Sequence, residues 1–312
     1  MTEPRIVTLT VNPTVDIACT AESVRPVHKV RTHSEMQDPG GGGVNVARVV
    51  HELGGNVCAI VLAGGFPGHF LEELLAEEQV PSRVLRIAGR TRISYTVHDL
   101  ARSQQEYRFV AEGPHVSADE WQAALEAVER EPADWIVASG SLAPGMPEDF
   151  YARVAWAAAR TGRQFALDTS GAPLRAALGE GLALIKPSLG EFESLVGHKL
   201  RRVDELEQAA STMVRNGAAA RIAVTQGHLG AVLATATGVI HLPPIEVEAR
   251  SAVGAGDSFT GAMVLALARG ATDEDAFAWG MAGGAAAVMH TGTAHPARAD
   301  VERLHAKLRN VA

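Results

Sequence analysis

Residues 253–262 read Val-Gly-Ala-Gly-Asp-Ser-Phe-Thr-Gly-Ala, a glycine-rich turn that runs directly into an Ala-rich stretch with a helical pattern. Free N–H groups at the start of a helix, together with the positive end of its dipole, favour a bound anion such as phosphate. Asp257 follows the turn at once, where a carboxylate can accept a hydroxyl proton during phosphoryl transfer. The alternative is that Asp257 caps its own helix. This segment alone does not distinguish the two roles, so the other motifs of the sequence are needed.

A second glycine run lies near the N-terminus, where residues 38–47 read Asp-Pro-Gly-Gly-Gly-Gly-Val-Asn-Val-Ala. Successive glycines cost conformational entropy, so they usually mark a sharp turn or a close approach of the backbone to a ligand. Asn45, just inside the helix that follows, is a candidate hydrogen-bond partner for a polyol. A flexible loop is the alternative interpretation.

Between these two runs, short Val- and Ile-rich segments alternate with longer helical patterns, which predicts βαβ units and a mostly parallel sheet. The fold class is therefore α/β. Strands are expected at 6–11, 57–62, 135–138, 165–167, 182–185 and 222–224, and helices at 44–53, 70–78, 118–129, 148–159, 203–216, 257–268 and 273–289.

Two regions depart from this alternation, the first near residues 90–112 and the second near residues 12–38. Residues 92–98 and 106–110 alternate apolar and polar side chains, as strands with one wet face do, and together predict a hairpin with Arg92 and Arg108 on its polar face. Residues 12–38 are also extended in character, with three prolines in or next to them that oppose a helix. We expect one domain over residues 1–312, with segments of about 12–38 and 90–112 forming a small projecting sheet, the lid.

Composition excludes several classes of function. The chain has 312 residues, 46% of them hydrophobic, and a net charge of -8, which disfavours an extended nucleic-acid or anionic-membrane surface. Two cysteines, no leader pattern and no apolar run long enough to span a bilayer predict a cytoplasmic protein. The sequence contains no P-loop, dinucleotide-binding, H-E-x-x-H or G-x-S-x-G motif.

The paired glycine-rich segments, with Asn45 in one and Asp257 in the other, resemble the two signatures of the ribokinase-like, PfkB-type carbohydrate kinases. Residues 12–16, 105–109, 140–142, 167–171 and 186–187 extend the resemblance along the chain, and it is closest to the sugar-phosphate branch. The resemblance implies a three-layer α/β sandwich with a lid that closes over the sugar and forms a homodimer contact.

The resemblance also implies roles for residues that match the family's motifs. Asp257 would be the catalytic base, and Gly254, Ala255 and Gly256 would form an anion hole. The substrate-binding residues would be Asp16, Lys29, Gly41, Gly42, Asn45, Arg92, Arg108 and Ser141. The nucleotide-binding residues would be Lys186, Thr225, Gly227 and Gly230, and Glu191 would reach a metal ion through water.

The activity implied is ATP-dependent phosphorylation of a ketohexose phosphate with Mg²⁺, foremost the glycolytic conversion of fructose 6-phosphate to fructose 1,6-bisphosphate. Alternatives are a 1-phosphofructokinase or tagatose-6-phosphate kinase, then a ribokinase-like or nucleoside kinase, and, in another class, an impaired member that senses sugar phosphate or nucleotide. Where the family has Asn-x-x-Glu, this chain has Ser188-Leu189-Gly190-Glu191.

Overall fold

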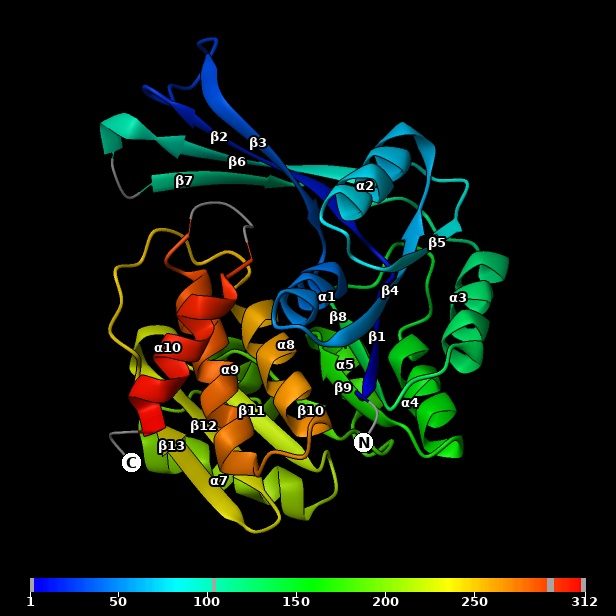
Figure 1. Cartoon of the computed structure of the whole chain (residues 1–312), viewed down its shortest axis with the longest axis vertical. Coiled ribbons are helices and arrows are strands. Elements are labelled where there is room, and N and C mark those ends of the chain that lie inside the picture. The colour runs from blue at the N-terminus through cyan, green and yellow to red at the C-terminus, as the bar shows by residue number, and fades with distance from the viewer. Residues whose placement is uncertain (1–2, 103–104, 291–294, 310–312) are drawn as a thin grey trace.

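A computed structural model describes residues 3–102, 105–290 and 295–309, and its strands form two separate sheets (Figure 1). The larger sheet contains β1 (Arg5–Thr10), β4 (Asn56–Ala63), β5 (Ser82–Arg86), β8 (Trp135–Ser139), β9 (Gln164–Asp168), β10 (Leu184–Ile185), β11 (Arg221–Thr225), β12 (Ala231–Thr235) and β13 (Gly238–Leu242). Their order is β13-β12-β11-β10-β9-β8-β1-β4-β5. All neighbours are parallel except β12 and β13, which add an antiparallel hairpin at one edge.

Helices cover both faces of the large sheet and create two cores. The helices are α1 (Gly42–Glu52), α2 (Gly65–Glu77), α3 (Ala118–Arg130), α4 (Phe150–Arg160), α5 (Gly171–Ala177), α6 (Leu189–Val196), α7 (Val203–Arg215), α8 (Ala255–Ala268), α9 (Asp273–Ala287) and α10 (Arg298–Arg309). Along β4, Ala59 and Val61 pack with α1, α2, α8, α9 and α10, whereas Ile60 and Leu62 pack with α3 to α7. This alternation buries both faces, as parallel sheets require.

The order of the strands reverses beside β1, which lies between β4 and β8. In open α/β sheets, ligands bind outside the carboxyl ends of the strands at such a reversal. The residues at or just after the ends of β1, β8, β9, β10 and β11 are therefore the ones that the fold presents to a ligand.

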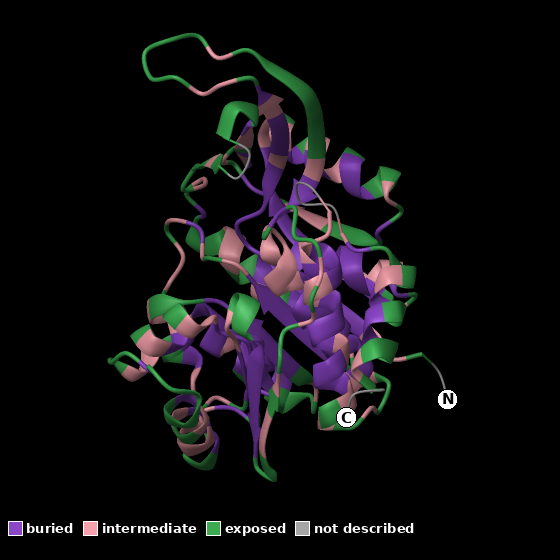
Figure 2. Ribbon diagram, turned by 90° about the vertical axis from the view of Figure 1, so that its left-hand side faces the viewer, coloured by how far each residue is buried: buried purple, intermediate pink, exposed green. Residues whose placement is uncertain are grey.

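The smaller sheet, called here the lid sheet, consists of β2 (Thr14–Ala21), β3 (Thr32–Gly40), β6 (Arg92–Asp99) and β7 (Gln105–Val110), in the order β3-β2-β6-β7. It projects from one end of the molecule (Figure 1), and β3 is exposed along much of its length, as the green strand of Figure 2 shows. The central strands β2 and β6 are parallel, and the outer pairs are antiparallel.

Most of the predicted elements are confirmed, including the hairpin of 92–98 with 106–110; its connection includes residues 103 and 104, which lie outside the described residues. Two boundaries were wrong. The helix predicted from Phe70 begins at Gly65, because Pro67 is tolerated in a first turn. The strand predicted over 182–185 is only Leu184–Ile185, and β5, β12 and β13 were not predicted. In the part of the chain that the structure describes, no helix has the length and hydropathy of a membrane span.

Candidate active site

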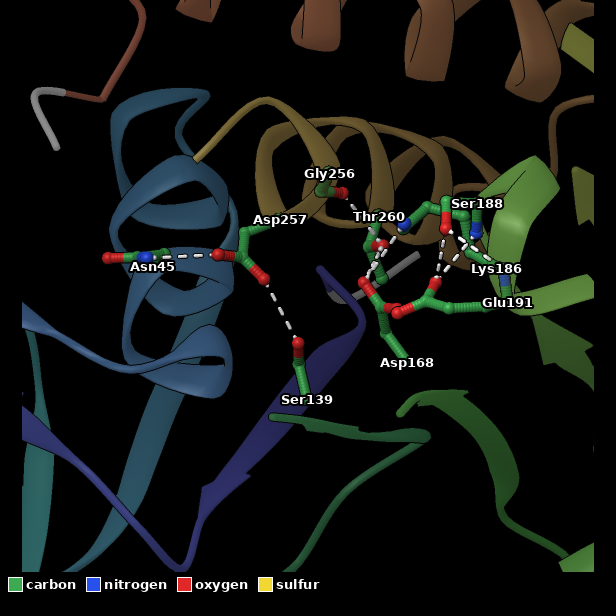
Figure 3. Close-up of polar contacts among 9 residues, drawn as sticks. All are labelled: Asn45, Ser139, Asp168, Lys186, Ser188, Glu191, Gly256, Asp257 and Thr260. Carbon is green, nitrogen blue, oxygen red and sulfur yellow. Dashed lines mark hydrogen bonds and ion pairs between the residues drawn. The ribbon is translucent and has the colours of Figure 1, made fainter. Parts of the chain in front are cut away.

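Asp257 lies in the first turn of α8, which begins after Gly254 in a left-handed conformation with φ of 75°. Its carboxylate does not cap the helix. Instead, Oδ2 accepts a hydrogen bond from Asn45 Nδ2 at 2.9 Å, and Oδ1 accepts one from Ser139 Oγ at 3.0 Å (Figure 3). Burial and the nearby Asp168 raise the pKa of Asp257 from 3.8 to about 6, against the opposing effect of Asn45, Ser139 and Lys186. The carboxylate is therefore held in place by α1 and β8.

The second glycine run is tightly packed and is not a flexible loop. Gly41, the N-cap of α1, has φ of 109°, which favours glycine. A Cβ atom on Gly42 would lie 2.2 Å from Ser139 Oγ, and one on Gly40 would lie 2.2 Å from Asp16 Oδ2. Asn45 Oδ1 is buried without a hydrogen-bond partner among the described residues, so it is available to a ligand hydroxyl.

A buried cation adjoins Asp257. Lys186 follows β10, is 5% exposed, and forms an ion pair of 3.2 Å with Asp168 Oδ2 at the end of β9. Burial lowers the pKa of Lys186, but the carboxylates of Asp168, Asp257 and Glu191 outweigh it, so the net shift is upward and the ammonium stays charged. A Cβ on Gly256 would lie 3.1 Å from Lys186 Nζ. The ammonium of Lys186 and the amino end of α8 thus both place positive charge next to Gly256.

Ser188 and Glu191 form a capping box at the start of α6. The backbone N–H and the hydroxyl of Ser188 each donate to Glu191 Oε2 at 2.8 Å, and Glu191 N–H donates back to Ser188 Oγ at 3.4 Å. Figure 3 shows Glu191 facing Asp168. Within the described ranges, no three His, Cys, Asp or Glu side chains form a preformed metal cluster. Two facing carboxylates do suit Mg²⁺, which commonly takes one or two carboxylates and completes its shell with water and phosphate oxygens.

Thr225, Gly227 and Gly230 lie beside this capping box. Thr225 N–H donates to Pro187 O at 3.1 Å, and Thr225 forms a parallel bridge with Ser188. Gly230 has φ of 96° and leaves no room for a Cβ, which would lie 2.2 Å from Leu242 O. The structure therefore places Lys186 and Thr225 at the ends of the neighbouring strands β10 and β11, with Gly227 and Gly230 in the turn that follows β11.

Asp16 lies on β2 of the lid sheet, with its carboxylate packed against Gly40 just before α1. Burial raises its pKa from 3.8 to about 6, a shift that Asp38 adds to and that Thr14, Arg92 and Arg108 oppose. Arg108 is exposed on β7, on the same face of the sheet as Asp16 and Arg92. Both arginines thus lie close enough to act on the charge of Asp16.

Asn12, which follows β1, joins Arg92 to Ser141. Its carbonyl oxygen accepts from Arg92 Nη2 at 2.8 Å, and its Nδ2 lies 3.3 Å from Ser141 Oγ and donates to Glu112 O at 3.0 Å. Arg92 also lines a cavity of about 480 Å³ whose other members include Arg90 and His115. Glu112 lines the same cavity, so two arginines and one carboxylate give it a net positive charge, which suits a phosphate.

Lys29 is not brought to these residues. It is exposed in the connection between β2 and β3, which Figure 1 shows at the outer end of the lid sheet, and within the described residues it forms no ion pair or side-chain hydrogen bond.

Sequence reasoning missed Ser139 and Asn12 as parts of the site. Both are polar residues at the end of a buried strand, next to the point where the strand order reverses, and that position was the available signal. Thr260 was also missed, and its position inside a helix offered no comparable signal. Its hydroxyl lies 3.4 Å from Asp168 Oδ2 and donates to Gly256 O at 3.0 Å.

Comparison with known proteins agrees with this geometry. The profile of a family described as pfkB family carbohydrate kinase matches residues 10–300. An ATP-dependent 6-phosphofructokinase isozyme 2 from Mycobacterium tuberculosis is 41% identical over 303 residues, covering 96% of this chain and 89% of the relative. A 1-phosphofructokinase from Bacillus subtilis is more distant, at 28% identity over 90% of this chain and 91% of its own.

Among solved structures, phosphofructokinase-2 from Escherichia coli in complex with fructose-6-phosphate superimposes with a TM-score of 0.92. The two sequences are 37% identical, and the match covers 98% of this chain and 99% of the other.

Proposed function

Because the chain belongs to the pfkB family of carbohydrate kinases, we propose that it transfers the γ-phosphoryl group of ATP to a hydroxymethyl group of fructose 6-phosphate. The product would be fructose 1,6-bisphosphate. A phosphofructokinase-2 that shares the fold over nearly its whole length is described in complex with fructose-6-phosphate.

The observation that carries the proposal is the setting of Asp257. Its carboxylate is fixed by Asn45 and Ser139 at the start of α8, beside backbone N–H groups and the buried ammonium of Lys186. In this arrangement Asp257 takes the proton of the attacking hydroxyl, while the N–H groups of Gly254, Ala255 and Gly256 bind the negative charge that develops on the transferred group. Asn45 Oδ1 accepts a hydrogen bond from the sugar.

The sugar phosphate lies between the lid sheet and the end of β1. Asp16 binds a sugar hydroxyl, and Arg92, Arg108 and Ser141 bind the phosphate that the sugar already carries. Within one chain Lys29 is not part of this group, because it lies in the connection between β2 and β3. Closure of the lid sheet would exclude water and make these charged contacts stronger.

ATP lies along the ends of β10 and β11, against Lys186, Thr225, Gly227 and Gly230. Glu191 would hold Mg²⁺ through water, and the ion would offset the negative charge of the ATP phosphates. Lys186 stays protonated and orients the γ-phosphate toward Asp257.

The test is an ADP-release assay with a panel of acceptors at fixed ATP and Mg²⁺: fructose 6-phosphate, fructose 1-phosphate, tagatose 6-phosphate, fructose, ribose and adenosine. We expect the highest kcat/KM with fructose 6-phosphate. Faster turnover of fructose 1-phosphate or of an unphosphorylated acceptor would reject the assignment. Calorimetric binding of fructose 6-phosphate without any ADP release would identify a sensor instead.

We also propose a homodimer formed through the lid sheet. Four large apolar side chains of this sheet are exposed by more than two fifths: Met36, Tyr95, Phe109 and Val110. Exposed apolar area combined with the two unpaired edge strands β3 and β7 favours association. ATP as substrate and two unpaired cysteines fit a cytoplasmic location.

A further inference from the structure

Arg48 is a buried cation that the proposed chemistry does not use. It lies in α1, one turn after Asn45, and its side chain is 2% exposed. Nε and Nη2 donate to the two carboxylate oxygens of Glu78, each at 2.6 Å. Glu78 directly follows α2. This two-pronged pair fixes the plane of the guanidinium, because both donors and both acceptors are committed.

The other side of the same guanidinium contacts the lid sheet. Nη1 donates to Pro39 O and Nη2 to Asp38 Oδ1, both at 3.3 Å. Pro39 and Asp38 are near the end of β3, immediately before the glycines that lead into α1. Glycines give this connection little stiffness of their own. Arg48 therefore links the base of the lid sheet to both α1 and α2.

The contact between Arg48 and Asp38 also affects the position of Asp16. Asp38 lies directly opposite Asp16 in the antiparallel pairing of β2 with β3, and its charge raises the pKa of Asp16. Like charges opposite one another destabilise a sheet. The guanidinium next to Asp38 offsets this repulsion and keeps the strand close, so that Gly40 stays packed against the Asp16 carboxylate.

We propose that Arg48 is a positioning residue that sets the base of the lid sheet, and with it Asp16, relative to Asp257. One helix thereby carries two links, from Asn45 to the carboxylate of Asp257 and from Arg48 to the strand opposite Asp16. The inference rests on the proposed function, because it takes Asp16 as the group that binds a sugar hydroxyl. It predicts that Arg48 affects the binding of the sugar but not the binding of ATP.

The experiment compares Arg48→Met, Arg48→Lys and Glu78→Gln with the wild type, measuring KM for fructose 6-phosphate, KM for ATP and kcat. For Arg48→Met we expect KM for fructose 6-phosphate to rise about tenfold or more while KM for ATP stays within about twofold, since only the sugar-binding strand moves. Arg48→Lys should recover part of the loss, because it restores the charge next to Asp38 but not the fork toward Glu78.

Arg221→Met is the matched control. Arg221 forms a partly buried ion pair of 2.6 Å with Asp273, away from the lid sheet, so its loss should lower the melting temperature without raising KM for the sugar. If Arg48→Met does not fold, Glu78→Gln decides, with an expected rise of about threefold or more in KM for the sugar alone.

An unchanged KM for fructose 6-phosphate in the folded variants overturns the positioning role, and so does a parallel rise in KM for ATP or an equal rise in Arg221→Met. A wild-type protein that neither binds nor phosphorylates fructose 6-phosphate overturns the proposed function, and this inference with it.

Discussion

The hydroxyl oxygen of Ser139 lies 2.2 Å from the point that a Cβ atom on Gly42 would occupy. Ser139 in turn donates to Asp257 at 3.0 Å. The absence of a side chain at Gly42 therefore determines where the carboxylate of Asp257 stands.

Substitution of Gly42 by alanine should displace Ser139 and, through it, Asp257. We expect kcat/KM for fructose 6-phosphate to fall about 10²-fold, the usual scale for a displacement near 1 Å. Gly190→Ala is the control, because it is also a glycine in the first turn of a helix and its Cβ would meet open space. Equal activity of Gly42→Ala and wild type would show that Ser139 does not position the carboxylate.

Asp257→Asn removes the proposed catalytic base. The amide cannot act as a base, so kcat should fall at least about 10²-fold, whereas binding of fructose 6-phosphate measured by calorimetry should persist. Near-normal turnover in the variant would exclude Asp257 as the base.

The same variant should be more stable than the wild type above pH 6. The folded-state pKa of Asp257 is about 6, above the ordinary 3.8, so the folded protein binds the proton more tightly than the unfolded chain does. Stability is then lost as the pH rises from 4 to 6, and Asp257→Asn should gain up to about 3 kcal/mol in the free energy of unfolding at pH 7.

Urea denaturation at pH 4, 5, 6 and 7 measures this gain. Glu193→Gln is a control of opposite sign, because the hydrogen bond from Lys199 lowers the pKa of Glu193 and its loss should destabilise at neutral pH. A gain from Asp257→Asn that is the same at pH 4 and pH 7 would contradict the prediction.

Arg92→Ala should weaken binding of the sugar phosphate by about 1.5–3 kcal/mol, the range for a lost hydrogen bond to a charged group. Because Arg92 also donates to the carbonyl oxygens of Asn12 and Ala111, thermal unfolding must be recorded alongside. Binding of unphosphorylated fructose serves as the comparison and should be unaffected, because this sugar has no phosphate for Arg92 to bind. If KM for fructose 6-phosphate does not change, Arg92 is not a phosphate ligand.

Phe109→Asp should separate the proposed dimer. Phe109 is 58% exposed on the edge strand β7, and a charge there would be buried in the interface. Sedimentation should give a dimer of 32.8 kDa chains for the wild type and a monomer for the variant. Phe66→Asp, which alters an 82% exposed side chain of α2, should leave the dimer intact. A monomeric wild type, or dissociation in both variants, would argue against association through the lid sheet.

The sequence predicted those parts of the molecule that local pattern encodes. Glycine runs predicted turns that lead into helices, and the structure confirms both: Gly42 has no room for a side chain, and Gly254 takes a left-handed conformation just before α8. Alternating side chains predicted the hairpin of β6 and β7. Local pattern does not show which distant strand ends meet, so the contacts of Ser139 and Asn12, and the position of Arg48 between two elements, emerged only in three dimensions.

The lid sheet joins segments that are far apart in the chain, since Thr14 and Ser94 share a hydrogen bond of 2.9 Å across 80 residues. A two-stranded hairpin of β2 and β3 is marginal in water by itself, and contacts over such separations form slowly. During synthesis, the hairpin of β2 and β3 therefore becomes stable only after β6 has been made. The complete site also requires α8, which is made much later. A chain that ends before α8 lacks Asp257, so the proposed acceptor site is completed only late in synthesis.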